Sequence, residues 1–377
     1  CWHLRFRNGR IVEANKLISA IGALHIPNRP EIKGAETFAG DMFHSAEWQQ
    51  DVDLTGKRVA VIGTGASAIQ FVPAIVQKVK SITVFQRSPA WVIPKPDREI
   101  GSLEKKLYNS FSSLMSLQRG RTWLQLETRA IAFNYARNVL KLLEARAKRY
   151  IRSQVKDPAK AEALTPDYRI GCKRILISND FYSAMNRNHV SIETDAISEI
   201  TEKGIIDANG NLHEVDVIIL GTGFKTLDAI KDLHVANGEG TTLAETWKNG
   251  AHCHLGTMVS GFPNFFLLLG PNTGLGHSSQ VFMIESQINY VSDAIKKMKK
   301  MDVASVDVRP SVQAAFIDKI QASMKRTIWT TGCDSWYLDA NGKNWTTWPG
   351  FTFAFRWMTR KFDLNQHICE RDLTAIK

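Results

Sequence analysis

The sequence has few cysteines, and none of them stands at a metal-binding or redox spacing. The five, Cys1, Cys172, Cys253, Cys333 and Cys369, are odd in number, scattered and never in a C-x-x-C pair. This pattern argues against a disulfide framework and against a structural zinc site. We therefore expect a reducing, cytoplasmic setting and no metal site.

Long apolar runs are also missing. The longest, Leu17–Ile26, which His25 interrupts, and Phe265–Leu269, fall well short of the roughly 18 residues typical of a membrane span. We expect no transmembrane helix. No secretory leader is expected either, because the N-terminus lacks a basic region followed by an apolar one.

Acidic residues are in the minority. The 48 lysines and arginines outnumber the 37 aspartates and glutamates, which gives a net charge of +11. A basic balance favours anionic partners such as nucleic acid, membrane surfaces or phosphorylated ligands. However, no zinc finger, aromatic RNA-binding signature or basic zipper accompanies the basic clusters at 141–156 and 296–300. We interpret them as solvated helix faces and expect no nucleic-acid partner. The sequence does not specify an oligomeric state.

The remaining composition is that of a globular protein of 377 residues, which is long enough for two or three domains. Residues 1–27 predict short strands with a turn at Asn8-Gly9. Val59–Ile62 and Ile82–Phe85 predict buried strands on either side of a helix from about Ser67 to Lys78, which makes a βαβ unit. Helical spacing then dominates from about Leu103 to Ala163. Further strands are predicted at Val190–Ile192, Gly204–Ile206 and Val215–Leu220, and a long helix at Ser278–Lys300.

A dinucleotide-binding pattern, Gly63-x-Gly65-x-x-Ala68, joins the first of these strands to the helix. The first glycine permits the tight turn, the second lets the backbone approach a pyrophosphate, and the small Ala68 lets helix and strand pack closely. Ala66 and Ser67 complete the start of the helix, where free N–H groups face the phosphates. The alternative is a glycine turn that binds nothing.

The end of the second strand indicates which cofactor binds. Folds specific for NAD place an acidic residue there, on the ribose hydroxyls. This chain has Gln86-Arg87-Ser88 instead. A guanidinium can hold a 2′-phosphate by two parallel hydrogen bonds, so Arg87 predicts NADP. The alternative is a surface arginine at a strand end.

Upstream of the nucleotide fold, the segment 38–48 has the form F-x-G-x-x-x-H-x-x-x-W, built from Phe38, Gly40, His44 and Trp48. It resembles the signature of Baeyer–Villiger monooxygenases, flavoproteins that insert oxygen beside a ketone. Related enzymes that oxidise nitrogen or sulfur usually end this motif in tyrosine, so Trp48 favours the ketone-oxidising branch. The family often continues with proline or aspartate, where this chain has Gln49.

Four later segments carry the same resemblance, which covers nearly the whole chain. The first lies before the strand that returns to the NADP domain, and the last is similar to the flavin-side loop. They are Asp167-Tyr168-x-x-Gly171-Cys172-Lys173-Arg174, Asn179–Tyr182, Asp216–Phe224 and Gly270–Ser278.

The resemblance implies an α/β fold with two dinucleotide-binding, Rossmann-like domains and a helical insertion in the NADP domain. No second glycine fingerprint precedes residue 63. The FAD domain is therefore expected to be incomplete, with on the order of 100 residues absent before Cys1. The expected divisions are 1–50 for partial FAD domain and linker, 51–99 and 166–224 for the NADP domain, 100–165 for the insertion, and 225–377 for the rest of the FAD domain.

For the reaction, the resemblance implies that NADPH reduces FAD, that O2 then gives a flavin peroxide, and that this attacks a ketone to yield an ester or lactone. Arg174 matches the family arginine that provides a positive charge beside the peroxide. Lys173 matches a residue on the NADP 2′-phosphate, and the alternative for Lys173 and Arg174 is an ordinary basic dipeptide on a loop. Trp336 matches a tryptophan near the NADP, with core packing as the alternative. His44 matches a residue that couples domain movement to cofactor position, with a structural histidine as the alternative.

Two other functions stay open on the sequence alone. One is an oxygenase for nitrogen or sulfur in soft substrates. The other is a catalytically incomplete NADP-binding fragment, which the missing FAD fingerprint supports.

Overall fold

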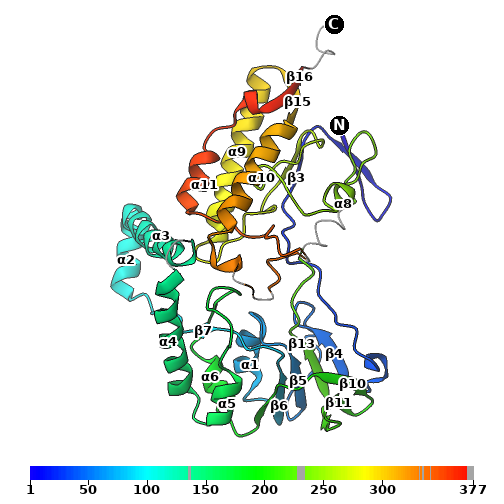
Figure 1. The fold of residues 1–377 in the computed structure, drawn as a ribbon, viewed down its shortest axis with the longest axis vertical. Coiled ribbons are helices and arrows are strands. Elements are labelled where there is room, and N and C mark those ends of the chain that lie inside the picture. Colours follow the sequence, from blue (N-terminus) through cyan, green and yellow to red (C-terminus); the bar gives the residue numbers. More distant parts are fainter. Residues whose placement is uncertain (135–136, 227–233, 331, 333–334, 340, 372–377) are drawn as a thin grey trace. The chain divides into compact units, whose positions relative to one another are not determined.

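The chain folds as two compact units, each built from separate stretches of sequence. The computed structural model describes residues 1–134, 137–226, 234–330, 332, 335–339 and 341–371. Unit 1 comprises Cys1–His25, Gly101–Arg137 and Thr226–Lys377, and unit 2 comprises Ile26–Ile100 and Asn138–Lys225. In Figure 1 the sheet of unit 2 and the helices α9, α10 and α11 of unit 1 mark the two units.

Unit 2 is organised around a five-stranded, wholly parallel sheet with the order β4-β13-β5-β6-β9. The predicted strands around residues 59, 82, 190 and 217 are all confirmed as members of this sheet. The strands are β4 (Asp41–His44), β5 (Arg58–Ile62), β6 (Ser81–Phe85), β9 (Val190–Glu193) and β13 (Val217–Leu220).

The two central strands are continuous apolar runs because both faces of a parallel sheet are covered. Val59 and Val217, which are paired in register, are both fully buried. Helix α1 (Ala68–Ile75) links β5 to β6, and α6 (Phe181–Met185) precedes β9. The helix α1 ends earlier than the predicted Lys78. Pro73 lies inside it, and proline provides no N–H for the helical ladder.

The segment expected to be a linker between domains contributes a strand. The strand β4 is an edge strand of the sheet and pairs with β13 in parallel, from Asp41 opposite Val217 to His44 opposite Leu220. A smaller antiparallel sheet, which includes the predicted strand at Gly204–Ile206, packs beside it. Its strands are β10 (Ile197–Thr201), β11 (Gly204–Asp207) and β12 (Leu212–Glu214). Separately, β7 (Val92–Ile93) and β8 (Leu176–Ile177) form a two-stranded parallel sheet.

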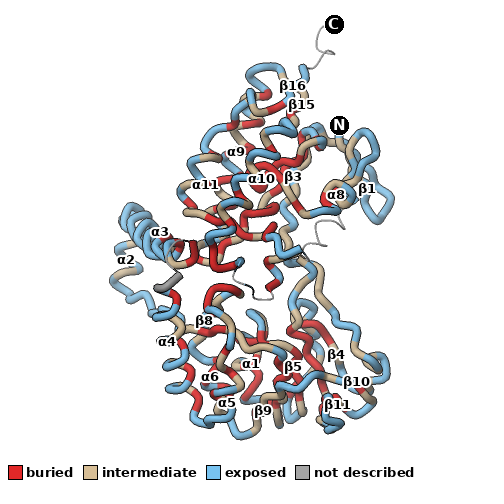
Figure 2. Tube along the Cα trace, in the orientation of Figure 1, coloured by how far each residue is buried: buried red, intermediate tan, exposed pale blue. Residues whose placement is uncertain are grey.

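The predicted helical stretch is present and is divided between the units. The helices α2 (Ser102–Ser110) and α3 (Ser112–Asn134) belong to unit 1, whereas α4 beyond Arg137 and α5 belong to unit 2. Figure 2 shows α2 and most of α3 as exposed. The helix α4 spans Arg137–Gln154, and α5 spans Pro158–Ala163. The side chain of Asp157 caps the N-terminus of α5.

Unit 1 begins with the predicted short strands, and its core lies between long helices and a strand pair. The predicted helix over 278–300 is confirmed as α9. The elements are β1 (Trp2–Arg5), β2 (Ile11–Ala14), β3 (Leu17–Ser19), α8 (Leu243–Thr246), β14 (Phe265–Leu267), α9 (Gln280–Lys300), β15 (Val303–Val308), α10 (Pro310–Met324), α11 (Thr352–Met358) and β16 (His367–Arg371). Within the described residues, no helix has both the length and the apolar character needed to cross a membrane.

The cysteines differ from expectation at one position. Cys1, Cys253 and Cys369 are free thiols, and burial raises the pKa of Cys253. Cys172 is disulfide-bonded, and its partner is not among the described residues. The argument against a disulfide framework therefore does not hold at Cys172, because spacing in the sequence does not report which distant side chains the fold brings together. Cys333 lies outside the described residues.

Candidate functional site

The glycine turn after β5 has the geometry that the dinucleotide pattern predicts. Gly63 has a φ of +102°, and its N–H donates to the carbonyl of Phe85 at 2.8 Å. A Cβ at Gly63 would lie 2.6 Å from the carbonyl oxygen of Gly221, so no larger residue fits there. A Cβ at Gly65 would meet that oxygen at an ordinary 3.8 Å. Packing therefore does not require Gly65, which fits its predicted role of letting a ligand approach the backbone.

The start of α1 presents the features of a phosphate site. Ala68 is fully buried, and a Cβ placed on Gly221 would lie 3.5 Å from its methyl group. This close approach explains the small third residue of the pattern. The carbonyl of Ala66 accepts a hydrogen bond from the side chain of Gln70 at 2.6 Å, and Ser67 occupies the N-cap position. The N–H groups of Ile69, Gln70 and Phe71 already donate to the carbonyls of Gly65 and Ser67. The preceding N–H groups, at residues 66–68, have no backbone acceptor among the described residues and are available to an anion.

Two cationic residues meet at the end of β6. Arg87 follows the buried Gln86 and is exposed, and no ion pair engages its guanidinium in the described part of the chain. The ammonium of Lys173 lies 3.1 Å from the hydroxyl of Ser88 and 4.8 Å from the centroid of the Tyr168 ring. Residues 85 positions apart are thus brought together beside the glycine turn, as a 2′-phosphate site requires.

Arg174 follows Lys173 directly and precedes β8. Its guanidinium is exposed, and among the described residues it has no hydrogen-bond partner. The segment before it is held in place on both sides. The N–H of Ile170 donates to Glu144 of α4 at 3.0 Å, and the indole of Trp91 donates to the carbonyl of Tyr168 at 2.9 Å. Arg174 is therefore a free positive charge on an ordered segment.

The first half of the F-x-G-x-x-x-H-x-x-x-W segment is explained by packing. A Cβ at Gly40 would lie 2.2 Å from the carbonyl oxygen of Asp216 and 2.8 Å from the ring of Phe38. Phe38 itself packs against a core cluster that includes Ile62 and Ile218. The glycine thus lets the chain pass directly beside the start of β13.

The second half of the same segment is also structural. His44 is fully buried, its Nδ1 accepts the N–H of Ala46 at 3.1 Å, and burial lowers its pKa. The ring is therefore neutral near pH 7, with its proton on Nε2. Trp48 packs between Phe43 of β4 and Phe71 of α1, at centroid distances of 5.3 and 5.5 Å. The motif thus holds the edge strand β4 against the helix α1.

Trp336 belongs to unit 1, whereas the other predicted site residues belong to unit 2. Its ring is 43% exposed and contacts Tyr337 at a centroid distance of 4.4 Å. Cys333 and Asp334, which precede it in the matching segment, lie outside the described residues. The contact with NADP that the resemblance implies stays a prediction.

The loop Gly270–Ser278 of unit 1 contains a buried polar group that the sequence analysis missed. The Nε2 of His277 lies 3.4 Å from Glu127 of α3, and Glu127 also accepts the N–H of Thr352 at 2.8 Å. Burial lowers the pKa of His277. The hydroxyl of Ser278 is buried without a partner within the described residues. The available signal was that Glu127 is the one acidic residue in the sequence of α3.

One group of side chains in unit 2 resembles a metal site. Ligand atoms of Glu193, Asp207 and His213 all lie within 4.8 Å of one another. However, the carboxylate of Asp207 already accepts hydrogen bonds from the N–H groups of Asn209 and Asn211 at 2.9 Å and from His213 Nε2 at 3.0 Å. The His213 contact is the main cause that lowers the pKa of Asp207. These bonds indicate a group that orders the β11–β12 turn.

Comparison with known proteins relates this geometry to an enzyme family. Residues 7–134 match the family model described as pyridine nucleotide-disulphide oxidoreductase. A Baeyer–Villiger monooxygenase of Pseudomonas aeruginosa is 45% identical over 378 residues, which cover 100% of this chain and 72% of the relative. A Baeyer–Villiger monooxygenase of Streptomyces coelicolor is also 45% identical, with 97% of this chain and 71% of the relative covered.

Two solved structures have a similar fold over almost the whole chain. A complex of OTEMO with FAD and NADP superposes with a TM-score of 0.86 at 26% identity, covering 98% of this chain and 78% of that one. An oxidised steroid monooxygenase bound to NADP gives a TM-score of 0.84 at 28% identity with the same coverage. The α/β fold of this chain is therefore that of proteins with FAD- and NADP-binding Rossmann domains.

Proposed function

We propose that this chain, which belongs to the Baeyer–Villiger monooxygenases, uses NADPH, FAD and O2 to convert a ketone to an ester or lactone. The observation that carries the proposal is the cationic end of β6. There Lys173 reaches Ser88 beside Arg87, and Arg174 follows as an unpaired guanidinium. One end of this arrangement suits the NADP phosphate, and the other suits negative charge that develops on oxygen.

The NADP is held by the turn and the strand end of unit 2. Gly63, Gly65 and the residues that lead into α1, Ala66–Ala68, bind the pyrophosphate through backbone N–H groups. Arg87 and Lys173 bind the 2′-phosphate, which both residues reach from the same end of the sheet. The fit is supported by the space at Gly65, which packing does not fill, and by the absence of an acidic residue in Gln86-Arg87-Ser88.

Bound FAD supplies the redox and oxygen chemistry, and the protein supplies charge and position. We assign Arg174 the role of a fixed cation that stabilises negative charge on the reacting oxygen. Its guanidinium stays protonated at every working pH. The flavin-side loop Gly270–Ser278 is supported as a ligand-binding segment by the unpartnered hydroxyl of Ser278. Trp336 is proposed to contact NADP.

The same assignment gives a division of the chain by cofactor. We assign NADP to unit 2 and the flavin side to unit 1. The NADP domain, expected at 51–99 and 166–224, then corresponds to residues 26–100 and 138–225, and the flavin side takes the remaining residues. The FAD domain is proposed to be incomplete in this chain, because no second glycine fingerprint precedes residue 63. The helices α2 to α5 are the proposed insertion.

The proposed partners are a small ketone and O2, and not nucleic acid. We place the enzyme in the cytoplasm, which the free thiols of Cys1, Cys253 and Cys369 support and the disulfide bond at Cys172 does not. Cell fractionation with an antibody against the chain checks this location. Recovery in an oxidising compartment would contradict it.

Product analysis tests the proposed reaction directly. The chain is incubated with FAD, desalted, and examined for a visible flavin band before NADPH and a cyclic or linear ketone are added under ¹⁸O2. We expect an ester or lactone that carries one labelled oxygen, formed only when both cofactors are present. The proposal would be contradicted if the chain retained flavin and consumed NADPH but made no ester, and instead only converted an added thioether to a sulfoxide.

The cofactor assignment makes a separate prediction. Changing Arg87 to alanine removes two charge-assisted hydrogen bonds to the 2′-phosphate, each worth roughly 1.5–3 kcal/mol. We expect the dissociation constant of NADPH to rise at least tenfold while that of NADH changes little, as measured by fluorescence titration. The control is Arg187→Ala, which removes an exposed arginine of unit 2 outside the site. Equal weakening of both nucleotides would show that Arg87 does not bind the 2′-phosphate.

A further inference from the structure

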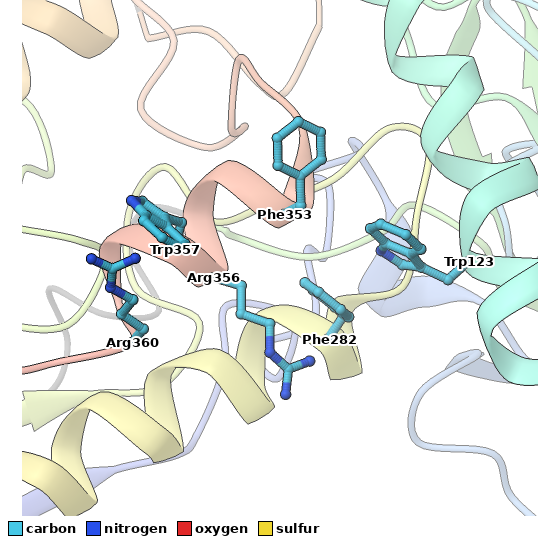
Figure 3. A pocket seen from close by; sticks show the side chains of 6 residues that line it. All are labelled: Trp123, Phe282, Phe353, Arg356, Trp357 and Arg360. Carbon is cyan, nitrogen blue, oxygen red and sulfur yellow. The ribbon is translucent and has the colours of Figure 1, made fainter. Parts of the chain in front are cut away.

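Unit 1 carries a hollow of about 400 Å³ that the reaction proposed above does not use. It opens where α3, the first turn of α9 and α11 meet, and Figure 3 shows its side chains around an open space. Its volume is within the range of small-ligand sites, about 300–1,000 Å³. No acidic side chain lines it. The lining residues are Trp123, Phe282, Phe353, Arg356, Trp357 and Arg360.

The walls of this hollow are aromatic, and several remain open to solvent. The rings of Trp123 and Phe282 stack with centroids 6.0 Å apart and an interplanar angle of 20°. The indole N–H of Trp123 donates to the hydroxyl of Thr352 at 3.0 Å, which satisfies its polar edge and leaves the rest of the ring for apolar contact. Phe353 is 51% exposed and Trp357 is 67% exposed. A group of exposed aromatic rings usually marks a binding site.

Two guanidinium groups stand at the edge of the aromatic walls. Arg356 lies over Phe282 at 4.8 Å from the ring centroid, and Arg360 lies over Trp357 at 3.2 Å. Glu285 is 4.0 Å from Arg356, but its carboxylate already binds Arg119 by two contacts of 2.7 and 2.8 Å. Arg360 has no ion pair in the part of the chain that the structure describes. The hollow therefore combines apolar walls with positive charge that is only weakly compensated.

We propose that this hollow binds an amphipathic carboxylate, a molecule with an apolar chain or ring that ends in one carboxylate group. The apolar part packs on Trp123, Phe282 and Phe353, and the carboxylate accepts hydrogen bonds from Arg356 and Arg360. A neutral amphiphile satisfies only the aromatic walls, and a cationic one is repelled by the two arginines. The hollow is lined by residues of unit 1, whereas the nucleotide turn belongs to unit 2, so it is assigned as a second ligand site.

The test is a titration of the full chain with dodecanoate below its micelle concentration, followed by tryptophan fluorescence and calorimetry. We expect saturable binding at one site, and at least tenfold weaker binding of dodecanol and dodecylamine. The double variant R356A/R360A should weaken dodecanoate at least tenfold without changing its weak affinity for dodecanol. Trp357→Ala should weaken both ligands, because it removes part of the apolar wall.

Two controls separate binding from folding. Arg10→Ala removes an exposed arginine of the β1–β2 hairpin in unit 1 and should leave dodecanoate binding unchanged. R356K/R360K keeps both charges and should recover part of the affinity, and the thermal unfolding midpoint of each variant shows whether unit 1 is intact. Equal affinity for dodecanoate and dodecanol, or unchanged binding in R356A/R360A, would overturn the proposal. Retention only on phosphatidylglycerol vesicles, without saturable dodecanoate binding, would also overturn it.

Discussion

Changing Arg174 to alanine is expected to lower kcat for ketone oxygenation by on the order of 10²- to 10³-fold, with the affinity for NADPH almost unchanged. The expected loss in kcat is large because of the kind of interaction that Arg174 is proposed to make. A fixed cation aimed at charge that develops during the reaction is among the largest single contributions that a side chain makes. Because the guanidinium is exposed and unpaired among the described residues, its removal breaks no internal contact and should not change the fold.

The measurement compares ester formation with NADPH consumption in the flavin-loaded chain. With the alanine variant we expect NADPH to be consumed while little ester appears. Arg174→Lys keeps a positive charge but loses the planar fork, so partial recovery is expected. Arg169→Ala is the matched control, because Arg169 is half exposed and faces Glu144 at 3.7 Å. An alanine variant that makes ester at the parent rate would show that Arg174 has no part in the reaction.

The second large effect concerns stability and pH, and it arises from His254 in unit 1. Its ring is buried, packs against Phe316 of α10 at 5.2 Å and lies 6.4 Å from His367 of β16. Neither ring nitrogen has a hydrogen-bond partner within the described residues. Burial is the main cause that lowers the pKa of His254 from 6.5 to about 4, and the nearby His367 adds to it.

This lowered pKa predicts that the protein loses stability as the solution becomes acidic. Between about pH 6.5 and pH 4 the unfolded chain binds a proton at His254 and the folded chain does not. The free energy of unfolding therefore falls as the pH falls through this window, by roughly 3 kcal/mol in total from His254, and His254 adds no further change below it. Burial lowers the pKa of His367 as well, so its contribution has the same sign.

Denaturant unfolding at a series of pH values measures the effect. Replacing His254 with phenylalanine keeps an aromatic ring and removes the titrating group, so the slope between pH 6.5 and pH 4 should become shallower. His3→Gln removes an exposed imidazole and serves as the control, with an unchanged slope. If the phenylalanine variant kept the full slope, His254 would not be the group that titrates.

The parts of the fold that the sequence predicted well are those where one local pattern decides the structure. The strand β5 is a continuous apolar run, the turn after it needs glycine at residue 63, and a small residue must follow at Ala68. Each of these requirements depends on neighbours within a few positions. The end of the helix was less well predicted: α1 ends at Ile75, whereas the pattern predicted about Lys78.

What the sequence could not predict depends on long-range contacts. Lys173 and Ser88 are 85 residues apart, and His277 and Glu127 are 150 residues apart. No periodicity reports such pairs. The family resemblance suggested the first pair, whereas the lone acidic residue of α3 marks Glu127 without indicating His277 as its partner. The edge strand β4 was hidden for a similar reason. It has only four residues, and its pairing partner β13 lies more than 170 positions later in the chain.

The order of strands in unit 2 has a consequence for how the protein is made. In the described structure, β13 is the last strand of the sheet to be synthesised, yet it lies in the middle, between β4 and β5. A chain emerging from the ribosome therefore carries β4 without a partner, and β5 with one open edge, until residues 217–220 arrive. Unpaired strand edges favour aggregation, and long-range parallel pairing is slow. We expect nascent chains that stop shortly before residue 217 to depend on chaperones far more than chains that extend past residue 220.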